Sequence, residues 1–223
     1  MKNDNIKYAI FDMDGTLVDS MFYWRNLSAE YLSRHGIIID PSEILSKIKP
    51  MTVEEAAIFF IDHFNLNTTP KTALNEMNDI MYNHYRHNVQ IKPHITEYLN
   101  TLKIKNVNLC VASATSKHLI ELCLKRFDML KYFDFLLSCD EVGIGKHQPD
   151  VYNLAQHNFS SKFSTNISKS DIAIFEDASY AAKTAKNAGF YTVGIYDKWN
   201  STKFDEVKEI CDEYYLNWKE AIR

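Results

Sequence analysis

Residues 8–16 read YAIFDMDGT, an apolar run followed by two aspartates and a glycine. The run 8–11 predicts a short, fully buried strand, because four consecutive apolar residues are typical of strands covered on both faces. Asp12 and Asp14 follow at positions two apart, so on extended backbone their side chains point the same way. Gly15 allows the chain to turn tightly. The segment therefore predicts a strand that ends in an acidic loop, where a hard metal ion and a phosphate group could meet.

The length of 223 residues suits one large domain, or a core domain with a smaller insertion. A hydrophobic fraction of 46% and an aromatic fraction of 13% supply a core and exclude a disordered chain. The net charge of −4, with no long basic run, gives no reason to expect a nucleic-acid partner.

Residues 1–7 are polar and run directly into the first predicted strand, without the apolar core of a signal peptide. No apolar stretch approaches the roughly 20 residues that a membrane span needs, so no membrane partner is expected. The four cysteines lack metal-type spacing and are expected to be reduced core thiols, which favours a cytoplasmic location. A monomer is the default expectation.

Helical signals dominate from about residue 19 to about residue 91. They are an apolar stripe from Met21 to Leu32 stopped by Gly36, a capping box at Thr52 and Glu55, and Thr69-Pro70 at the start of a further helix. We therefore predict that residues 19–91 form an all-helical insertion, and that residues 1–18 and 92–223 form the core domain.

Strands and helices alternate from about residue 104 onward. The predicted strands are 107–112, 133–137, 171–175 and 191–196, and the predicted helices are 116–127, 151–158, 179–188 and one after 201. Strands separated by helices indicate right-handed crossovers and a parallel sheet covered on both faces. The predicted fold class is α/β, a doubly wound, Rossmann-like parallel sheet with an inserted all-helical domain.

Polar residues follow four of the predicted strands, at the sheet edge where ligands of such folds bind. They are Asp12 and Asp14, Ser113-Ala114-Thr115, Lys146, and Glu176-Asp177. The carboxylates suit Mg²⁺, which prefers about six oxygen ligands. Ser113 offers a hydroxyl at a helix start, and Lys146 offers a compact positive charge for phosphate. This combination is typical of phosphoryl transfer and not of hydride or acyl transfer.

With these motifs in this order, the chain resembles the haloacid dehalogenase (HAD) superfamily hydrolases. The resemblance extends over essentially the whole chain and is closest to the β-phosphoglucomutase-like phosphatase branch, whose helical cap follows the first motif. The matching motifs are Asp-x-Asp-Gly-Thr at 12–16, Ser113, Lys146 with Pro149-Asp150, and Glu176-Asp177 ahead of Ala188-Gly189. The resemblance implies a Mg²⁺-dependent phosphatase that hydrolyses a small phosphorylated metabolite, a sugar phosphate or nucleotide, through an aspartyl-phosphate.

The resemblance also implies a role for each matching residue. Asp12 would be the nucleophile, and Asp14 would be the general acid and base. The implied Mg²⁺ ligands are Asp12, Asp177, Glu176 and the backbone carbonyl of Asp14. The implied contacts of the transferring phosphoryl group are Ser113, Ala114 and Lys146. Thr16 is expected to order the loop.

Two alternative functions stay open at this point. A sugar phosphomutase of the β-phosphoglucomutase type is disfavoured by Trp24, which stands where those mutases carry a histidine at the start of the cap. A non-catalytic phosphometabolite-binding protein could dispense with Asp14, Lys146 or Asp177, and all three are present.

Substrate contacts are expected from the helical insertion. Arg25, Lys49 and Thr52 are the candidates, because they occupy the regions in which caps of this kind face the core. His84 and His87, three residues apart on one predicted helix, are expected to be exposed, since no third metal ligand is visible nearby.

Overall fold

The structure is a computed structural model that describes residues 6–48, 51 and 53–222. The described chain divides into two compact units. The core unit comprises the residues up to Asp19 and from Gln90 onward, and the helical insertion comprises Ser20–Val89. That these units are separate domains, with boundaries at 19 and 91, stays a prediction.

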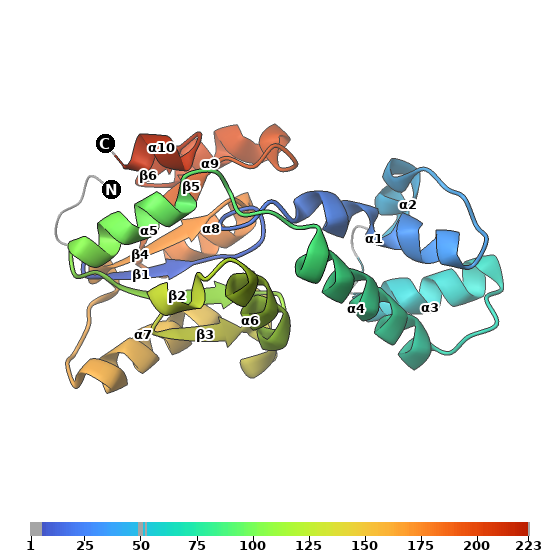
Figure 1. The fold of residues 1–223 in the computed structure, drawn as a ribbon, viewed down its shortest axis with the longest axis horizontal. Helices are drawn as coiled ribbons and strands as arrows, with labels where there is room; N and C mark the ends of the chain where they lie inside the picture. The colour runs from blue at the N-terminus through green and yellow to red at the C-terminus, as the bar shows by residue number, and fades with distance from the viewer. Residues whose placement is uncertain (1–5, 49–50, 52, 223) are drawn as a thin grey trace. The chain divides into compact units, whose positions relative to one another are not determined.

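One six-stranded parallel sheet, in the order β3-β2-β1-β4-β5-β6, forms the centre of the core unit (Figure 1). The strands are β1 (Tyr8–Phe11), β2 (Asn108–Ser113), β3 (Phe135–Ser138), β4 (Ile172–Glu176), β5 (Tyr191–Ile195) and β6 (Glu213–Tyr215). The prediction of a doubly wound parallel sheet is confirmed. The sequence did not predict β6 as a strand, because three residues are too few to show a two-residue alternation.

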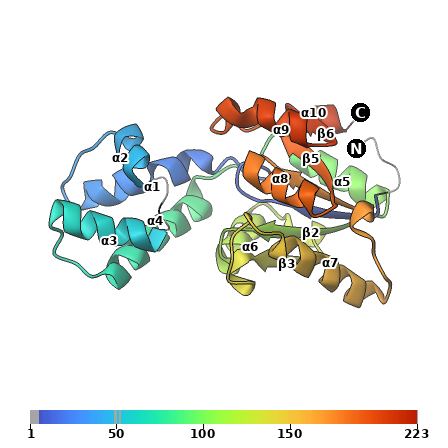
Figure 2. The ribbon, with the colours of Figure 1, turned by 180° about the vertical axis from the view of Figure 1, so that it is seen from behind.

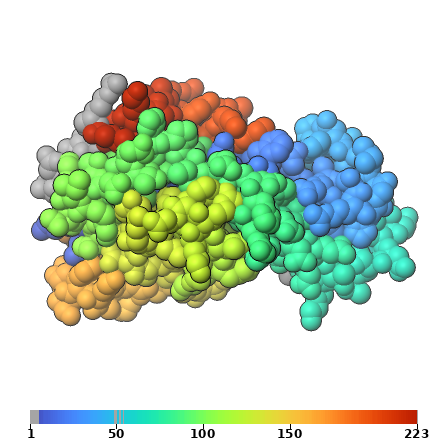
Figure 3. All heavy atoms as spheres, viewed as in Figure 1, coloured from blue at the N-terminus to red at the C-terminus, as the bar shows by residue number. Residues whose placement is uncertain are grey.

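Helices cover both faces of this sheet. One face carries α5 (Ile95–Ile104), α6 (Lys117–Arg126) and α10 (Trp218–Ala221), and the other carries α7 (Asp150–Phe163), α8 (Ser179–Asn187) and α9 (Phe204–Ile210) (Figure 2). In the space-filling view of the first face, residues of α5 and α6 hide most of the sheet (Figure 3). In the described part of this unit, short 3₁₀ helices also lie at Leu130–Tyr132, Cys139–Glu141, Lys169–Asp171 and Ser201–Lys203.

An aromatic cluster joins the central strands to the helices on the α5 face. Phe11 and Phe175 are register partners in β1 and β4, and their rings stack 4.3 Å apart. Trp218 packs against both rings and against Tyr98 of α5. The indole N–H of Trp218 also donates to the backbone carbonyl of Thr16 at 3.0 Å, so α10 fixes the loop that follows β1.

Side chains at alternate positions of the same strands face α7 instead. Ile10 and Ile174 lie in a buried cluster with Tyr152 and Phe159 of α7. Because side chains alternate along a strand, Glu176 lies on the same face as Ile174, two residues earlier. The strand period therefore directs the last side chain of β4 toward α7.

The helical insertion consists of α1 (Met21–Arg34), α2 (Pro41–Ile48), α3 (Val53–Phe64) and α4 (Pro70–His87). Helix α4 begins as expected, with Pro70 in the first turn and the Thr69 hydroxyl accepting the backbone N–H of Thr72. The sequence analysis did not single out α2, although Ile44, Leu45 and Ile48 lie on one face of this eight-residue helix. The capping residue expected at Thr52 lies outside the described residues.

A polar contact corrects one expectation in this unit. His84 Nε2 lies 2.6 Å from Glu30 Oε2 of α1, and the His84 side chain is 14% exposed, so the prediction that it is exposed is wrong. His87 is exposed, as predicted. The partner of His84 lies 54 residues earlier in the chain, which no local pattern reveals.

Two further expectations concern the whole chain. The four cysteines are free thiols, and three of them (Cys110, Cys123 and Cys139) are buried. Among the described residues, no helix is long and apolar enough to cross a membrane.

Replacing Trp218 with alanine should lower the free energy of unfolding by about 3–5 kcal/mol, because it leaves a cavity beside Phe11 and Phe175 and removes the donor to the Thr16 carbonyl. Urea denaturation measures the loss. Tyr214→Ala, which truncates a half-exposed aromatic side chain in β6, should cost about 1 kcal/mol or less. Equal losses for the two variants would contradict this assignment of the core.

Candidate active site

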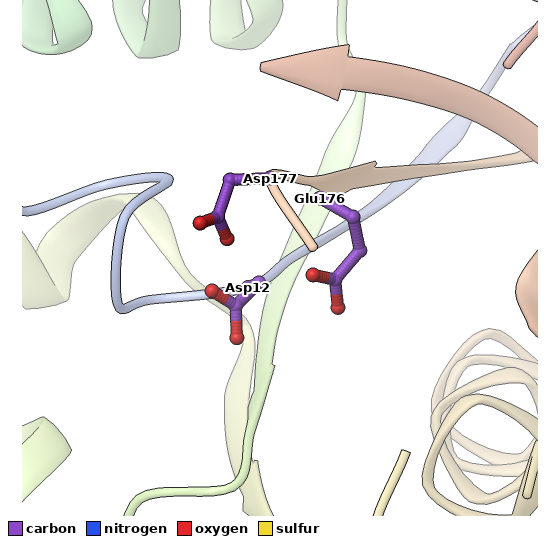
Figure 4. A group of neighbouring side chains, drawn as sticks. All are labelled: Asp12, Glu176 and Asp177. Atoms are coloured by element: carbon purple, nitrogen blue, oxygen red, sulfur yellow. The ribbon is translucent and has the colours of Figure 1, made fainter. Parts of the chain in front are cut away.

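The candidate site lies where the strand order reverses, between β1 and β4. Asp12 directly follows β1, Glu176 ends β4, and Asp177 is the next residue. One carboxylate oxygen of each residue lies within 4.8 Å of the others, and all three side chains are buried. Figure 4 shows the three carboxylates turned toward one another. Adjacent parallel strands that end at the same level therefore bring together acids that lie far apart in sequence.

Among the residues that the structure describes, one buried ammonium group, that of Lys146, contacts these acids. Lys146 Nζ contacts a carboxylate oxygen of Asp12 and lies 2.6 Å from Glu176 Oε1, and its side chain is 3% exposed. The loop that leads into α7 carries this lysine to the face toward which Glu176 points. One positive charge among three carboxylates leaves an excess of negative charge that a divalent cation would balance.

Neutral donors also contact these carboxylates. The hydroxyl of Tyr152 donates to Glu176 Oε1 at 2.7 Å. The Asn200 amide donates to Asp177 Oδ2 at 2.5 Å, and the Thr16 hydroxyl lies 3.4 Å from Asp177 Oδ1. These donors fix the carboxylates in place without cancelling their charge. That Thr16 orders the loop after β1 stays a prediction.

Asp14 lies slightly outside the buried cluster and has its own donor. The Thr115 hydroxyl donates to Asp14 Oδ2 at 2.6 Å. The backbone N–H of Thr115 in turn donates to the hydroxyl of Ser113, the last residue of β2, at 3.1 Å. Ser113 is buried, and Ala114 between them is exposed. The loop after β2 therefore holds Asp14 at the rim of the site.

A glycine is required at position 15, because the loop after β1 and the loop after β4 approach each other closely there. Its φ of +85° lies in the left-handed region that favours glycine, and a Cβ there would lie 2.7 Å from Cγ of Asp177. A side chain at this position would displace the Asp177 carboxylate.

Burial and crowding shift the protonation of these groups. Burial raises the pKa of Asp12 well above its ordinary range, although the Lys146 charge opposes the shift. Burial, followed by the charges of Glu176 and Asp197, raises the pKa of Asp177 to about 8. Burial alone would lower the pKa of Lys146, but the Asp12 and Glu176 carboxylates outweigh it and raise that pKa. The charge of Lys146 is thus too small to balance the three carboxylates, and hard oxygen donors of this kind fit Mg²⁺.

The residues predicted to contact substrate come from the helical insertion. Arg25 lies on α1 with an exposed side chain, whereas Lys49 and Thr52 lie outside the described residues. Their contacts with a substrate stay predictions.

Sequence reasoning missed Tyr152 and Asn200. Asn200 lies in the loop after β5, so the rule that polar residues after strands form the site could have found it. Tyr152 lies inside α7 among buried apolar residues, where a tyrosine resembles an ordinary core residue. Glu176 lies on the face of the sheet that α7 covers, and this placement is the signal that could have pointed to Tyr152 of α7.

A buried cluster of acids around one lysine, at the reversal point of a doubly wound sheet, defines a phosphoryl-transfer type of site. Residues 9–195 match the model of the family described as haloacid dehalogenase-like hydrolase. The chain belongs to this family, which confirms the resemblance seen in its motifs.

Individual relatives support the same class. The chain is 28% identical over 196 residues to validoxylamine A 7'-phosphate phosphatase of Streptomyces hygroscopicus subsp. limoneus, covering 85% of each chain. It is 23% identical to a phosphorylated carbohydrates phosphatase of Thermotoga maritima, covering 87% of this chain and 88% of that protein. Among solved structures, CbbY of Rhodobacter sphaeroides in complex with phosphate shares the fold, with a TM-score of 0.77, 19% identity and 96% of each chain covered. The prediction of a phosphoric monoester hydrolase of this family is confirmed.

Replacing Gly15 with alanine should cost more stability than the same change at Gly36, which has a similar φ of +78° but nothing within 4 Å of a Cβ. Gly36→Ala should lose about 1 kcal/mol from backbone strain alone. Gly15→Ala should lose more. If Mg²⁺ binds to the three carboxylates and raises the melting temperature of the wild type, Gly15→Ala should abolish that rise, because it displaces Asp177. If the two variants behave alike, the close approach of Gly15 to Asp177 does not matter.

Without metal, the protein should lose stability as the pH rises from about 4 to about 8. Asp177 has a folded pKa of about 8 against an ordinary value of 3.8, so in this window the folded state holds a proton that the unfolded state has released. Urea denaturation in EDTA at several pH values measures the slope. Asp177→Asn cannot ionise and should show a smaller fall, and an equal fall would contradict the shift.

Proposed function

We propose that the protein is a Mg²⁺-dependent phosphatase that hydrolyses a small phosphorylated metabolite, a sugar phosphate or a nucleotide, through an aspartyl-phosphate on Asp12. The observation that carries this proposal is the contact of Lys146 with both Asp12 and Glu176 inside a group of three buried carboxylates. The names of two relatives, one a phosphatase of validoxylamine A 7'-phosphate and the other a phosphatase of phosphorylated carbohydrates, support a small phosphorylated metabolite as the substrate.

The residues that would hold Mg²⁺ are Asp12, Glu176 and Asp177, together with the backbone carbonyl of Asp14. When bound, the ion would supply positive charge that stabilises the transferring phosphoryl group. The fit rests on the hard oxygen donors and on the excess negative charge of the cluster, which one lysine does not balance.

Asp12 would attack the phosphorus in line with the leaving oxygen, forming the bond from its carboxylate oxygen to phosphorus while the ester bond breaks. Asp14 would donate its proton to the leaving oxygen. In the second step Asp14 would take a proton from water, whose oxygen attacks the phosphorus and releases Asp12 and inorganic phosphate. Thr115, by its hydrogen bond to Asp14, would keep this acid and base in place.

Three residues would bind the phosphoryl group. Lys146 supplies positive charge beside the nucleophile. The Ser113 hydroxyl accepts the N–H of Thr115, and a hydroxyl that accepts can still donate its own proton to a phosphoryl oxygen. The backbone N–H of Ala114, the exposed residue that follows Ser113, is the third proposed donor.

A phosphatase is favoured over a sugar phosphomutase by the residue at position 24. The indole N–H of Trp24 donates to the Tyr85 hydroxyl at 2.9 Å inside the helical insertion. An indole cannot exchange protons near neutral pH as a histidine does.

Arg25, Lys49 and Thr52 stay the proposed substrate contacts. A monomer, a cytoplasmic location and the lack of a nucleic-acid partner also stay predictions.

The test is phosphate release from p-nitrophenyl phosphate and from a panel of sugar phosphates and nucleotides. The wild-type protein should release phosphate with Mg²⁺ and should stop when EDTA is added. Asp12→Asn should reduce the rate by about 10³-fold or more, because it removes the nucleophile. Asp205→Asn, the same change at an exposed carboxylate on α9, should leave the rate within about two-fold of wild type.

Phosphate release that survives Asp12→Asn would rule out Asp12 as the nucleophile. A wild-type protein that hydrolyses no member of the panel with Mg²⁺ present would contradict the proposed activity. Acid quenching during turnover, followed by mass spectrometry of the peptide that contains Asp12, should detect the covalent phosphate directly.

A further inference from the structure

We propose that Tyr152 of α7 is a positioning residue of the metal site, whose hydroxyl holds the Glu176 carboxylate in the orientation that binds a divalent cation. This inference rests on the proposed function in one respect, namely that Glu176 belongs to the metal site. It assigns to α7 a role that its sequence does not suggest.

The geometry of Tyr152 leaves its hydroxyl little freedom. The residue is fully buried, and its ring packs in the apolar cluster between α7 and the sheet, 6.2 Å from the ring of Phe190. The ammonium group of Lys146 lies 5.8 Å from the centre of the ring. The hydroxyl emerges from this packing 2.7 Å from Glu176 Oε1. A buried phenol needs a hydrogen-bond partner, and Tyr152 finds it in a carboxylate of the site.

Tyr152 and Lys146 share the same oxygen of Glu176. Both donate to Oε1, so Oε2 is the oxygen that neither of them contacts. Lys146 also contacts Asp12 and would bind the phosphoryl group during turnover, so its charge is divided among several partners. Tyr152 contacts Glu176 from a rigid helix. It is therefore the donor that can keep Glu176 in place while Lys146 serves the substrate.

The surroundings of Tyr152 argue against a purely structural role for its hydroxyl. The cluster around the ring is apolar, and phenylalanine would fill the same space without a polar atom to bury. The hydroxyl thus contributes through Glu176. Groups that hold a metal ligand in this way typically change metal affinity by 10–100-fold when they are removed.

The test compares Mg²⁺ binding by the full-length wild-type protein and Tyr152→Phe, measured by isothermal titration calorimetry with MgCl₂ and no substrate. The Kd for Mg²⁺ should rise about 10-fold or more in the variant. Tyr215→Phe is the matched control, because Tyr215 is also a buried phenol of the core unit that donates to a buried carboxylate, Glu213. Its Kd for Mg²⁺ should stay within about two-fold of wild type.

Two further variants separate a positioning role from a general loss of structure. In a Glu176→Gln background, Tyr152→Phe should cause no additional loss of Mg²⁺ affinity, because the carboxylate on which it acts is gone. Tyr152→Met, which fills similar space with a flexible apolar side chain, replaces Tyr152→Phe if that variant does not fold. Circular dichroism of the metal-free proteins checks that each variant is folded.

The outcomes distinguish the inference from the proposed function. An unchanged Kd in Tyr152→Phe, or an equal loss in Tyr215→Phe, would overturn the positioning role. A wild-type protein that binds no Mg²⁺ would overturn it as well. If the wild type binds Mg²⁺ and Tyr152→Phe weakens that binding, but no phosphate ester is hydrolysed, then the proposed phosphatase activity fails and the role of Tyr152 stands.

Discussion

The ammonium group of Lys146 is the interaction on which the rest of the site depends. Two adjacent parallel strands end at the same level, so they necessarily place Asp12 and Glu176 side by side in a buried position. Two carboxylates cannot stay charged there without a cation, because the interior solvates them poorly. Lys146 reaches both from the loop before α7. It thereby opposes the rise in the pKa of Asp12, the proposed nucleophile, that burial causes, and it leaves unbalanced charge for a divalent ion.

The other polar contacts of the site come from neutral donors, and each acid has a donor of a different chemical type. Asp14 is held by a threonine hydroxyl, Glu176 by a tyrosine hydroxyl, and Asp177 by an asparagine amide. None of these donors neutralises its acid, so orientation and charge are controlled separately. Charge control rests with Lys146 and the proposed metal ion. Orientation comes from groups anchored in α7 and in the loops after β2 and β5.

Those parts of the fold and site that depend on a residue's position next to a predicted strand could be predicted from the sequence. Asp12, Lys146 and Glu176 could be recognised because each follows a predicted strand, and parallel strands end at one edge. Strand β6, with three residues, is too short to produce a periodic pattern. Tyr152 escaped recognition because a buried helical position looks the same whether its hydroxyl is used or not. His84 required knowledge of a partner on another helix.

The place of β1 in the sheet has a consequence for how the chain folds during synthesis. This strand leaves the ribosome first, yet it lies between β2 and β4, whose first register partners are Asn108 and Ile172. The indole that fixes the following loop is 202 residues away from Thr16. Contacts so distant in sequence form slowly and late. A nascent chain therefore carries Asp12, the proposed nucleophile, long before β4 is synthesised and can place Glu176 and Asp177 beside it.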